Sequence, residues 1–263
     1  MTNDRRPAPR IIAPMIYRSD NRTPEQMRSV HLTPDFIHTA EGSVLIELGN
    51  TRVVCTATVD ELVPAWMRNS GKGWVTAEYG MIPRSTLTRT PREATRGHVG
   101  GRTHEIQRLI GRSLRAVVDL KKLGERTLWI DCDVLQADGG TRTASVTGAF
   151  VAMAIAIQRL VEAGTLKALP LRDYVAATSV GIVDGALLLD LSYEEDSRAE
   201  VDANFVLTGQ NKLVEVQCTA EQTPFDDQQL HAMLDLARRG IAELVALQRN
   251  VLKDLRLLSE GGK

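Results

Sequence analysis

One stretch of the chain, residues 143 to 163, is apolar on almost every side of the helix that its spacing predicts. Its small or apolar side chains include Ala144, Val146, Ala149, Phe150, Ala152, Met153, Ala156 and Ile157. A helix that is hydrophobic all round cannot lie on a surface, because part of its apolar area would then stay in water. The chain must therefore cover this helix with other elements, and we expect it to be buried.

Strand-like segments precede this helix and follow it in a similar order. Alternating side chains and short turns predict three hairpins, formed by residues 44–48 with 52–59, 175–183 with 186–191, and 203–207 with 213–219. A further strand is predicted over 127–135, and helices over 103–120 and 224–258. Each half of the chain thus runs through strands and then a helix. This order is typical of an α+β fold of two similar β-α subdomains, with mixed or antiparallel sheets packed against helices.

The chain changes character around Pro170, where we place the boundary between the two subdomains. Residues 1–10 are polar, basic and proline-containing, and we predict a flexible N-terminal arm over residues 1–18. We expect the first subdomain over residues 19–165, the second over 166–258, and a flexible C-terminal tail over 259–263.

Composition narrows the class of protein. The formal net charge is −1 and aromatic residues make up 4 %, so contact with RNA would depend on local clusters of charge and not on rows of stacking rings. The three cysteines are widely separated, which favours small buried core residues over a disulfide framework or a zinc site. The N-terminus lacks the apolar region of a secretory signal, and no stretch approaches the uninterrupted apolar length needed to span a bilayer. We therefore expect a cytoplasmic protein with no membrane contact.

A glycine-rich turn, residues 138–140, lies between the predicted strand and the apolar helix. Glycines let backbone N–H groups approach a ligand closely, and the first turn of a helix attracts an anion. Thr141 adds a hydroxyl, and Arg142 adds a planar fork of donors that matches phosphate. The alternative is a tight turn with a capping threonine. Arginine beside the cap, where the helix dipole disfavours a cation, favours the anion site.

The same arrangement occurs at residues 100–103, where two glycines precede Arg102 at the start of another predicted helix. Upstream, an irregular segment without apolar periodicity, residues 80–101, carries Arg84, Arg89 and Arg92. A run of charge is usually a solvated face. Arginines in a long loop beside a phosphate site, however, favour contact with a polyanion.

Carboxylates cluster between residues 190 and 202. In an extended strand Glu200, Asp202 and Asn204 share one face, and Asp196 precedes that strand. Such a cluster repels itself unless a cation lies within it, and Mg²⁺ binds oxygen ligands beside phosphates in this way. An acidic, solvated hairpin explains the pattern equally well.

These segments resemble the signatures of the ribonuclease PH family of phosphate-dependent 3′→5′ exoribonucleases. The matching segments are residues 18–22 with Arg28, 101–112, 129–145 and 193–204, and the resemblance extends from about residue 15 to 255. One position departs from the family, which commonly has glycine where this chain has Asn21. Asparagine tolerates the left-handed conformation better than most residues, so the turn can survive.

The resemblance implies a role for each candidate residue. Arg102, Gly140, Thr141 and Arg142 would hold an attacking inorganic phosphate, the co-substrate. Asp196 and Asp202 would be catalytic and would bind a divalent metal ion, which the resemblance implies to be Mg²⁺. Arg84, Arg89 and Arg92 would contact RNA.

The implied enzyme is a nucleotidyltransferase that trims extra nucleotides from the 3′ end of tRNA precursors and releases nucleoside diphosphates. The reaction would be reversible and could extend to rRNA. Protomers would pair into dimers, and three dimers would close into a homohexameric ring. The alternatives are a ring subunit that binds RNA without cutting it, and a small-molecule phosphotransferase. The second needs a nucleotide triphosphate loop, and no such motif is visible.

Overall fold

The computed structural model describes residues 18–221 and 223–253. The predicted N-terminal arm, except for Arg18, and the predicted tail lie outside the described residues, as does the segment in which a secretory signal was sought. Arg18 itself is buried.

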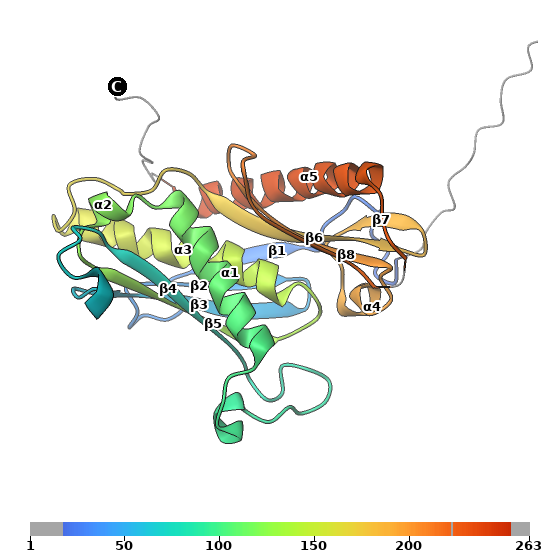
Figure 1. The fold of residues 1–263 in the computed structure, drawn as a ribbon, viewed down its shortest axis with the longest axis horizontal. Coiled ribbons are helices and arrows are strands. Elements are labelled where there is room, and N and C mark those ends of the chain that lie inside the picture. The colour runs from blue at the N-terminus through green and yellow to red at the C-terminus, as the bar shows by residue number, and fades with distance from the viewer. Residues whose placement is uncertain (1–17, 222, 254–263) are drawn as a thin grey trace, which may run out of the picture.

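Two sheets make up the strand content of the described chain (Figure 1). The first has the order β1-β2-β3-β5-β4, and the second has the order β7-β6-β8-β9. All neighbours are antiparallel except β4 and β5, which run parallel. The strands are β1 Val30–Pro34, β2 Gly42–Leu48, β3 Thr51–Asp60, β4 Trp74–Met81, β5 Thr127–Gln136, β6 Val175–Val183, β7 Ala186–Leu189, β8 Val201–Thr208 and β9 Leu213–Ala220.

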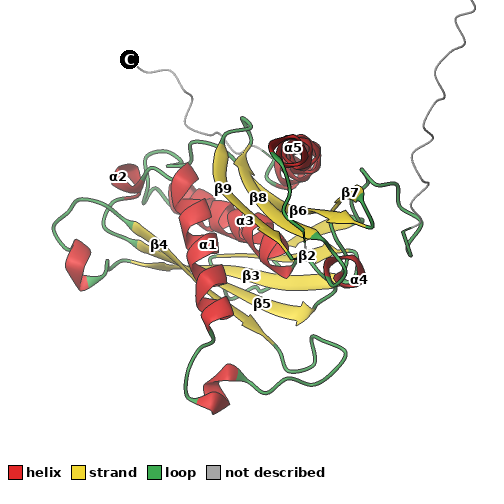
Figure 2. Ribbon diagram, turned by 45° about the vertical axis from the view of Figure 1, so that its right-hand side comes forward, coloured by secondary structure: helices red, strands yellow, loops and turns green. Residues whose placement is uncertain are grey.

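The helices fill the space between the sheets and cover one outer face. The long helices are α1 Gly101–Val117, α3 Thr141–Glu162 and α5 Asp227–Val251, and the short ones are α2 Leu120–Leu123, α4 Tyr193–Asp196 and the 3-10 turns Ala65–Met67 and Glu93–Arg96. Helix α3 contacts β2 and β3 on one side and β6 on the other, so it lies between the two sheets (Figure 2). Helix α1 packs beside it on β4, and α5 covers the second sheet.

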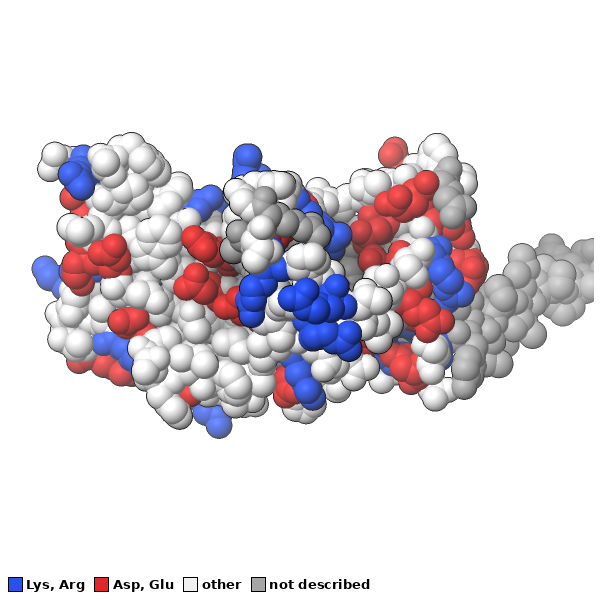
Figure 3. Space-filling model, turned by 90° about the horizontal axis from the view of Figure 1, so that it is seen from below, with Lys and Arg blue, Asp and Glu red and all other residues white. Residues whose placement is uncertain are grey.

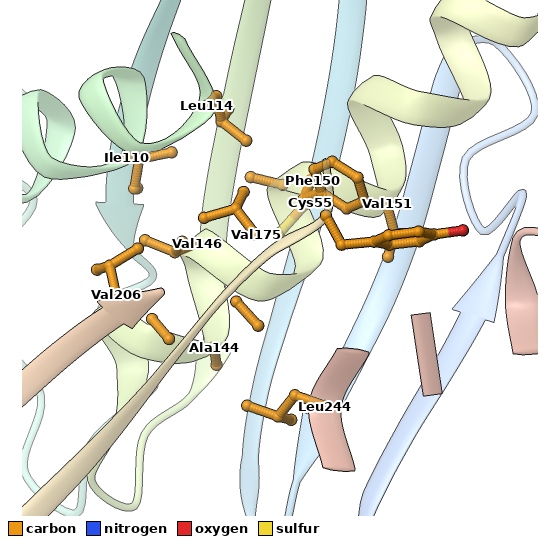
Figure 4. Packing of buried hydrophobic residues seen from close by; sticks show 14 of the residues in the cluster. Cys55, Ile110, Leu114, Ala144, Val146, Phe150, Val151, Val175, Val206 and Leu244 are labelled. Carbon is orange, nitrogen blue, oxygen red and sulfur yellow. The ribbon is translucent and has the colours of Figure 1, made fainter. Parts of the chain in front are cut away.

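The core is continuous across both sheets because α3 contributes to each. Phe150, Val146 and Ala144 of α3 are fully or almost fully buried, and they pack with Cys55 of the first sheet and Val175 of the second (Figure 4). Close approach needs a small residue at one point of the helix. A Cβ on Gly148 would lie 2.8 Å from Ile46 and 2.9 Å from the Cys55 sulfur, so only glycine lets α3 lie this close to β2 and β3.

By length and mean hydropathy, 1.6 over its most apolar window, α3 would be long and apolar enough to cross a membrane. By these two criteria alone it is an exception to the expectation that no stretch approaches the uninterrupted apolar length needed to span a bilayer. However, 72 % of that window is buried inside the protein, as expected for the core helix of a globular fold.

The predicted α+β architecture and the three hairpins are confirmed. The final helix is shorter than predicted, and residues 80 and 81, assigned to a loop, belong to β4. The sequence interpretation missed β1 and β4 entirely. Strand β4 is parallel to β5 and reaches it only through the crossover that contains α1, so no hairpin turn signals the pairing. Cys55 and Cys132 are buried free thiols, as predicted, whereas Cys218 is half-buried.

Candidate active site

A cleft of about 320 Å³ opens where the starts of α1 and α3 meet the second sheet. We call it the active cleft. Six of the predicted site residues line it: Arg102 from α1, Gly140, Thr141 and Arg142 from the start of α3, Asp196 from α4 and Asp202 from β8. The structure thus brings together all the predicted phosphate-binding residues and both predicted carboxylates, from positions about a hundred residues apart.

The glycine turn before α3 has a backbone conformation that residues other than glycine rarely adopt. Gly139 and Gly140 have φ values of 76° and 67°, in the left-handed region. A Cβ on Gly139 would also lie 2.6 Å from the carbonyl oxygen of Leu191. The turn is therefore pressed against the segment that leads into α4, and this contact sets the distance between the start of α3 and the carboxylate at Asp196.

Helices α1 and α3 begin without a capping side chain. Their N-cap residues are Gly100 and Gly140, neither makes a side-chain cap hydrogen bond, and neither first turn contains an acidic residue. In contrast, α5 begins with a capping box built on Asp226. Because first-turn N–H groups have no partner within their own helix, uncapped starts can donate to an anion. Both uncapped starts lie at the active cleft.

The Arg142 side chain is oriented by hydrogen bonds to two other side chains. Its Nη1 donates to Oε1 of Gln217 at 2.8 Å and to Oε1 of Glu105 at 3.2 Å, and Gln217 Nε2 donates to the same Glu105 oxygen at 2.8 Å. These contacts use one of the guanidinium nitrogens and orient the group. No sequence spacing connects the three residues, which come from α1, α3 and β9.

The Thr141 hydroxyl has a fixed partner as well. Tyr79 on β4 donates its phenolic hydrogen to Thr141 Oγ1 at 2.9 Å. Burial raises the pKa of Tyr79, so the phenol stays protonated and remains a donor. Since Thr141 Oγ1 accepts this bond, its own hydrogen is free to point at a ligand. Sequence reasoning missed Tyr79, because β4 itself was not predicted.

The carboxylate of Asp202 is held in an environment that disfavours its charge, and the pKa of Asp196 is raised as well. Burial raises the pKa of Asp202 to about 6, and the negative charge of Asp196 adds to this, against the opposing effect of Arg142 and Arg102. Partial burial also raises the pKa of Asp196, again against the two arginines. Asn204 lines the same cleft, whereas Glu200 instead accepts a hydrogen bond from the Gly185 amide at 2.9 Å. Among the described residues, no group of three or more acidic, histidine or cysteine side chains forms a ready metal site.

Replacing Asp202 with asparagine is expected to stabilise the protein by on the order of 2 kcal/mol at about pH 7.5. The sign follows from the raised pKa. Below the ordinary value of 3.8 the carboxyl is protonated in both the folded and the unfolded chain, and its titration contributes nothing. Between 3.8 and about 6 the folded state binds the extra proton, so stability falls as pH rises, and above 6 the charged form carries the whole cost.

Urea unfolding without divalent cations or phosphate, at about pH 7.5 and about pH 5, measures this effect. The gain should shrink at the lower pH. Asp235→Asn, at an exposed carboxylate on α5 paired with Arg238, is the matched control and should change little at either pH. An equal gain in the free energy of unfolding for Asp202→Asn at both pH values would contradict a raised pKa at Asp202.

A buried network of charged side chains connects the segments that border the active cleft. Arg28 donates from Nη2 and Nε to the Asp190 carboxylate at 2.6 and 2.9 Å, and it also donates to the carbonyl oxygen of Asp138 beside the glycine turn. Arg18 grips Glu195 through two bonds of 2.7 Å. Although burial alone would raise it, these bonds lower the pKa of Glu195. The network ties the N-terminal segment, the glycine turn and α4 to one another.

Asp190→Asn is expected to lower the free energy of unfolding by about 3–5 kcal/mol, because it leaves the buried Arg28 guanidinium without its counter-charge. Asp190 has a φ of 55°, and asparagine tolerates that conformation, so backbone strain does not confound the comparison. Asp35→Asn breaks an exposed pair with Arg159 and should cost less than about 1 kcal/mol. Chemical denaturation compares the two variants, and equal losses would show that the buried network has no special role.

The remaining predicted residues lie outside the active cleft. Arg84, Arg89 and Arg92 are exposed on the segment between β4 and α1, which hangs below the body of the molecule. When the molecule is seen from below, Lys and Arg side chains gather near the middle of its surface (Figure 3). Arg84 lines a second cleft of about 390 Å³ beside the first, whereas Arg89 and Arg92 line neither.

Comparison with known proteins identifies this architecture. Models of the 3′ exoribonuclease family match residues 26–157 as domain 1 and residues 173–240 as domain 2. Proteins named ribonuclease PH are 62 % identical over 236 residues in Solibacter usitatus, 59 % over 240 in Moorella thermoacetica and 58 % over 238 in Bacillus subtilis. These alignments cover 90, 91 and 90 % of this chain, and 99, 96 and 97 % of the relatives.

Solved structures share the fold at lower identity. Rice (Oryza sativa) Rrp46 superposes with a TM-score of 0.73 at 18 % identity, over 90 % of this chain and 100 % of that one. The Archaeoglobus fulgidus exosome with RNA bound to the active site superposes with a TM-score of 0.75 at 24 % identity. The match covers 90 % of this chain and 93 % of that one.

The paired β-α halves, with an arginine-lined cleft at their junction, define a phosphorolytic 3′→5′ exoribonuclease, which is a nucleotidyltransferase. Within that class, the chain belongs to the ribonuclease PH family.

Proposed function

We propose that this enzyme trims extra nucleotides from the 3′ end of tRNA precursors, using inorganic phosphate bound in the active cleft. One observation carries the proposal: the cleft sets two uncapped helix starts, each with an arginine, against a pair of carboxylates. The first arrangement suits an anionic nucleophile, and the second suits the metal-assisted handling of a phosphodiester.

The phosphate nucleophile would be held by Arg102 and by the start of α3. Gly140 brings the backbone close, the Thr141 hydroxyl donates with its orientation set by Tyr79, and the free donors of Arg142 neutralise charge. A phosphate oxygen attacks the last phosphodiester in line. The P–O3′ bond breaks, and the products are a nucleoside diphosphate and an RNA shortened by one nucleotide with a free 3′-OH. Most of the catalysis is positioning and charge stabilisation.

Asp196 and Asp202 fit a divalent cation such as Mg²⁺. Burial raises the pKa of both carboxyl groups, which disfavours their negative charges, and a hard cation bound to their oxygens would offset this cost. When bound, the ion would stabilise charge on the reacting phosphates. The protein's own part is to hold the two carboxylates at a fixed distance from Arg102 and Arg142.

The exposed arginines Arg84, Arg89 and Arg92 would contact the RNA outside the active cleft. Their position supports this role, because the segment that carries them leads directly into α1 and the cleft. Charge on an exposed segment strengthens binding through the phosphate backbone, whatever the base sequence.

We also propose a cytoplasmic homohexamer of three dimers, with subdomains over residues 19–165 and 166–258. The edge strand β9 supports assembly, since it exposes Leu213 and Val216 at 52 and 42 %. Sedimentation should then give about six times the chain mass of 28.9 kDa.

The activity is tested with a tRNA that carries extra 3′ nucleotides, with Mg²⁺, and with or without phosphate. Nucleoside diphosphates should appear only with phosphate, and excess diphosphate should reverse the reaction. Release of monophosphates without phosphate would contradict the proposal, and RNA binding without any release would favour a non-catalytic subunit. An unstructured RNA of the same 3′ sequence, trimmed equally well, would contradict the preference for tRNA.

A further inference from the structure

Tyr193 is an exposed aromatic residue at the edge of the active cleft. Aromatic residues are scarce in this chain, and Tyr193 is nevertheless 61 % exposed instead of contributing to the core. It lines both the active cleft and the second cleft, so it stands where the two meet. It is three residues before Asp196 on α4, which places both side chains on the same face of that turn.

The backbone under this ring is held firmly. Helix α4 begins with a capping box, in which Ser192 accepts from the Glu195 amide at 3.4 Å and Glu195 accepts from the Ser192 amide at 2.9 Å. Glu195 is in turn gripped by the buried Arg18. The backbone nitrogen of Tyr193 also lies against the glycine turn, because a Cβ on Gly139 would come within 2.7 Å of it. The backbone that carries the ring therefore has a fixed position relative to the start of α3.

The second cleft continues the active cleft away from the phosphate-binding residues. The two share Thr86, Ala137 and Tyr193. Beyond Tyr193, the second cleft is lined by the polar side chains of Asn50, Gln136 and Asp138, and it reaches Arg84 on the arginine-bearing segment. An RNA strand that runs from the carboxylates to these arginines would pass the exposed ring.

We propose that Tyr193 stacks on the base of the nucleotide just 5′ of the scissile bond, and that the second cleft holds this nucleoside. This inference rests on the proposed function, because it needs an RNA 3′ end at Asp196 and Asp202. An aromatic ring stacks on any base, so the contact tolerates every 3′ sequence. A tyrosine side chain has only two rotatable bonds and its backbone is already ordered here, so ordering the ring on binding costs little conformational entropy. Tyr193 thus positions the leaving strand while the arginines hold the nucleophile.

The test compares Tyr193→Ala with the wild-type enzyme on two RNAs, one intact and one with an abasic nucleotide just 5′ of the scissile bond. On intact RNA we expect kcat/KM to fall about 10-fold, with the KM for phosphate unchanged. On abasic RNA the two enzymes should be equal. Tyr193→Phe keeps the ring and should match the wild type on both. Phe36→Ala, at an exposed aromatic that lines neither cleft, is the control and should also match it.

An equal loss on both RNAs, no loss on either, or a rise in the KM for phosphate would overturn the stacking assignment. These outcomes are distinct from failure of the proposed function, which would appear as absence of phosphorolysis by the wild-type enzyme itself.

Discussion

Arg142→Ala is expected to lower kcat/KM for phosphorolysis by on the order of 10³-fold, the scale at which an arginine stabilises charge in phosphoryl transfer. The loss should appear in both kcat and the KM for phosphate, because the side chain would bind the nucleophile and stabilise it during attack. Folding should survive. The Arg142 side chain is 18 % exposed, and its partners Glu105 and Gln217 keep a hydrogen bond of 2.8 Å to each other. Steady-state kinetics with varied phosphate, alongside thermal unfolding, measures both expectations.

Arg159→Ala is the matched control for this variant. It removes the same side chain from the far end of the same helix, where Arg159 forms an exposed pair with Asp35 at 2.7 Å. Its activity should stay within about twofold of the wild type. Arg142→Lys should recover only part of the activity, because a lysine offers a point charge in place of a planar fork. Near-normal turnover of Arg142→Ala would remove this residue from the active site.

Asp202→Asn is expected to lower kcat by about 10²-fold or more while it stabilises the fold, since the substitution keeps the shape of the side chain and removes the charge. Such opposite effects on activity and stability are expected of a charged group whose burial costs stability but whose charge serves catalysis. The dependence of the residual activity on Mg²⁺ concentration should weaken as well, because one of the two proposed carboxylate ligands is lost. Kinetics over a range of Mg²⁺ concentrations checks both.

Asp184→Asn makes the same change outside the cleft. Asp184 is 68 % exposed, lies in the turn between β6 and β7 and has a φ of 49°, which asparagine tolerates. Its kcat and Mg²⁺ dependence should match the wild type. If Asp202→Asn kept the full dependence on Mg²⁺, the carboxylate would have no part in metal binding.

The active site depends on the position of α3 between the two sheets. Its buried length packs on β2 and β3 and on β6, and its uncapped start opens into the cleft. Glycines permit both features, Gly148 through close packing and Gly139 through the turn. The buried arginines then fix α4, and with it Asp196, against that turn. Residues outside the active cleft thus determine the distance between the proposed phosphate-binding residues and the carboxylates.

Sequence alone was sufficient for the features that depend on near neighbours in the chain. Alternation over a few residues predicted the hairpins, and an apolar helix surface predicted the burial of α3. The two glycine-arginine helix starts and the acidic cluster were each visible as local patterns. At Asn21, where the resembling family commonly has glycine, the backbone does adopt the left-handed conformation that asparagine tolerates, with a φ of 62°.

Tertiary structure alone decided how these patterns combine. Arg102, Arg142 and Asp202 are far apart in the chain, and only the packing of α1 and α3 against the second sheet brings them to one cleft. The parallel pairing of β4, the bond from Tyr79 to Thr141 and the partners of Arg142 were also beyond sequence reasoning. The reason is physical. A local pattern is set by backbone geometry over a few residues, whereas a contact between distant residues depends on the packing of the whole core.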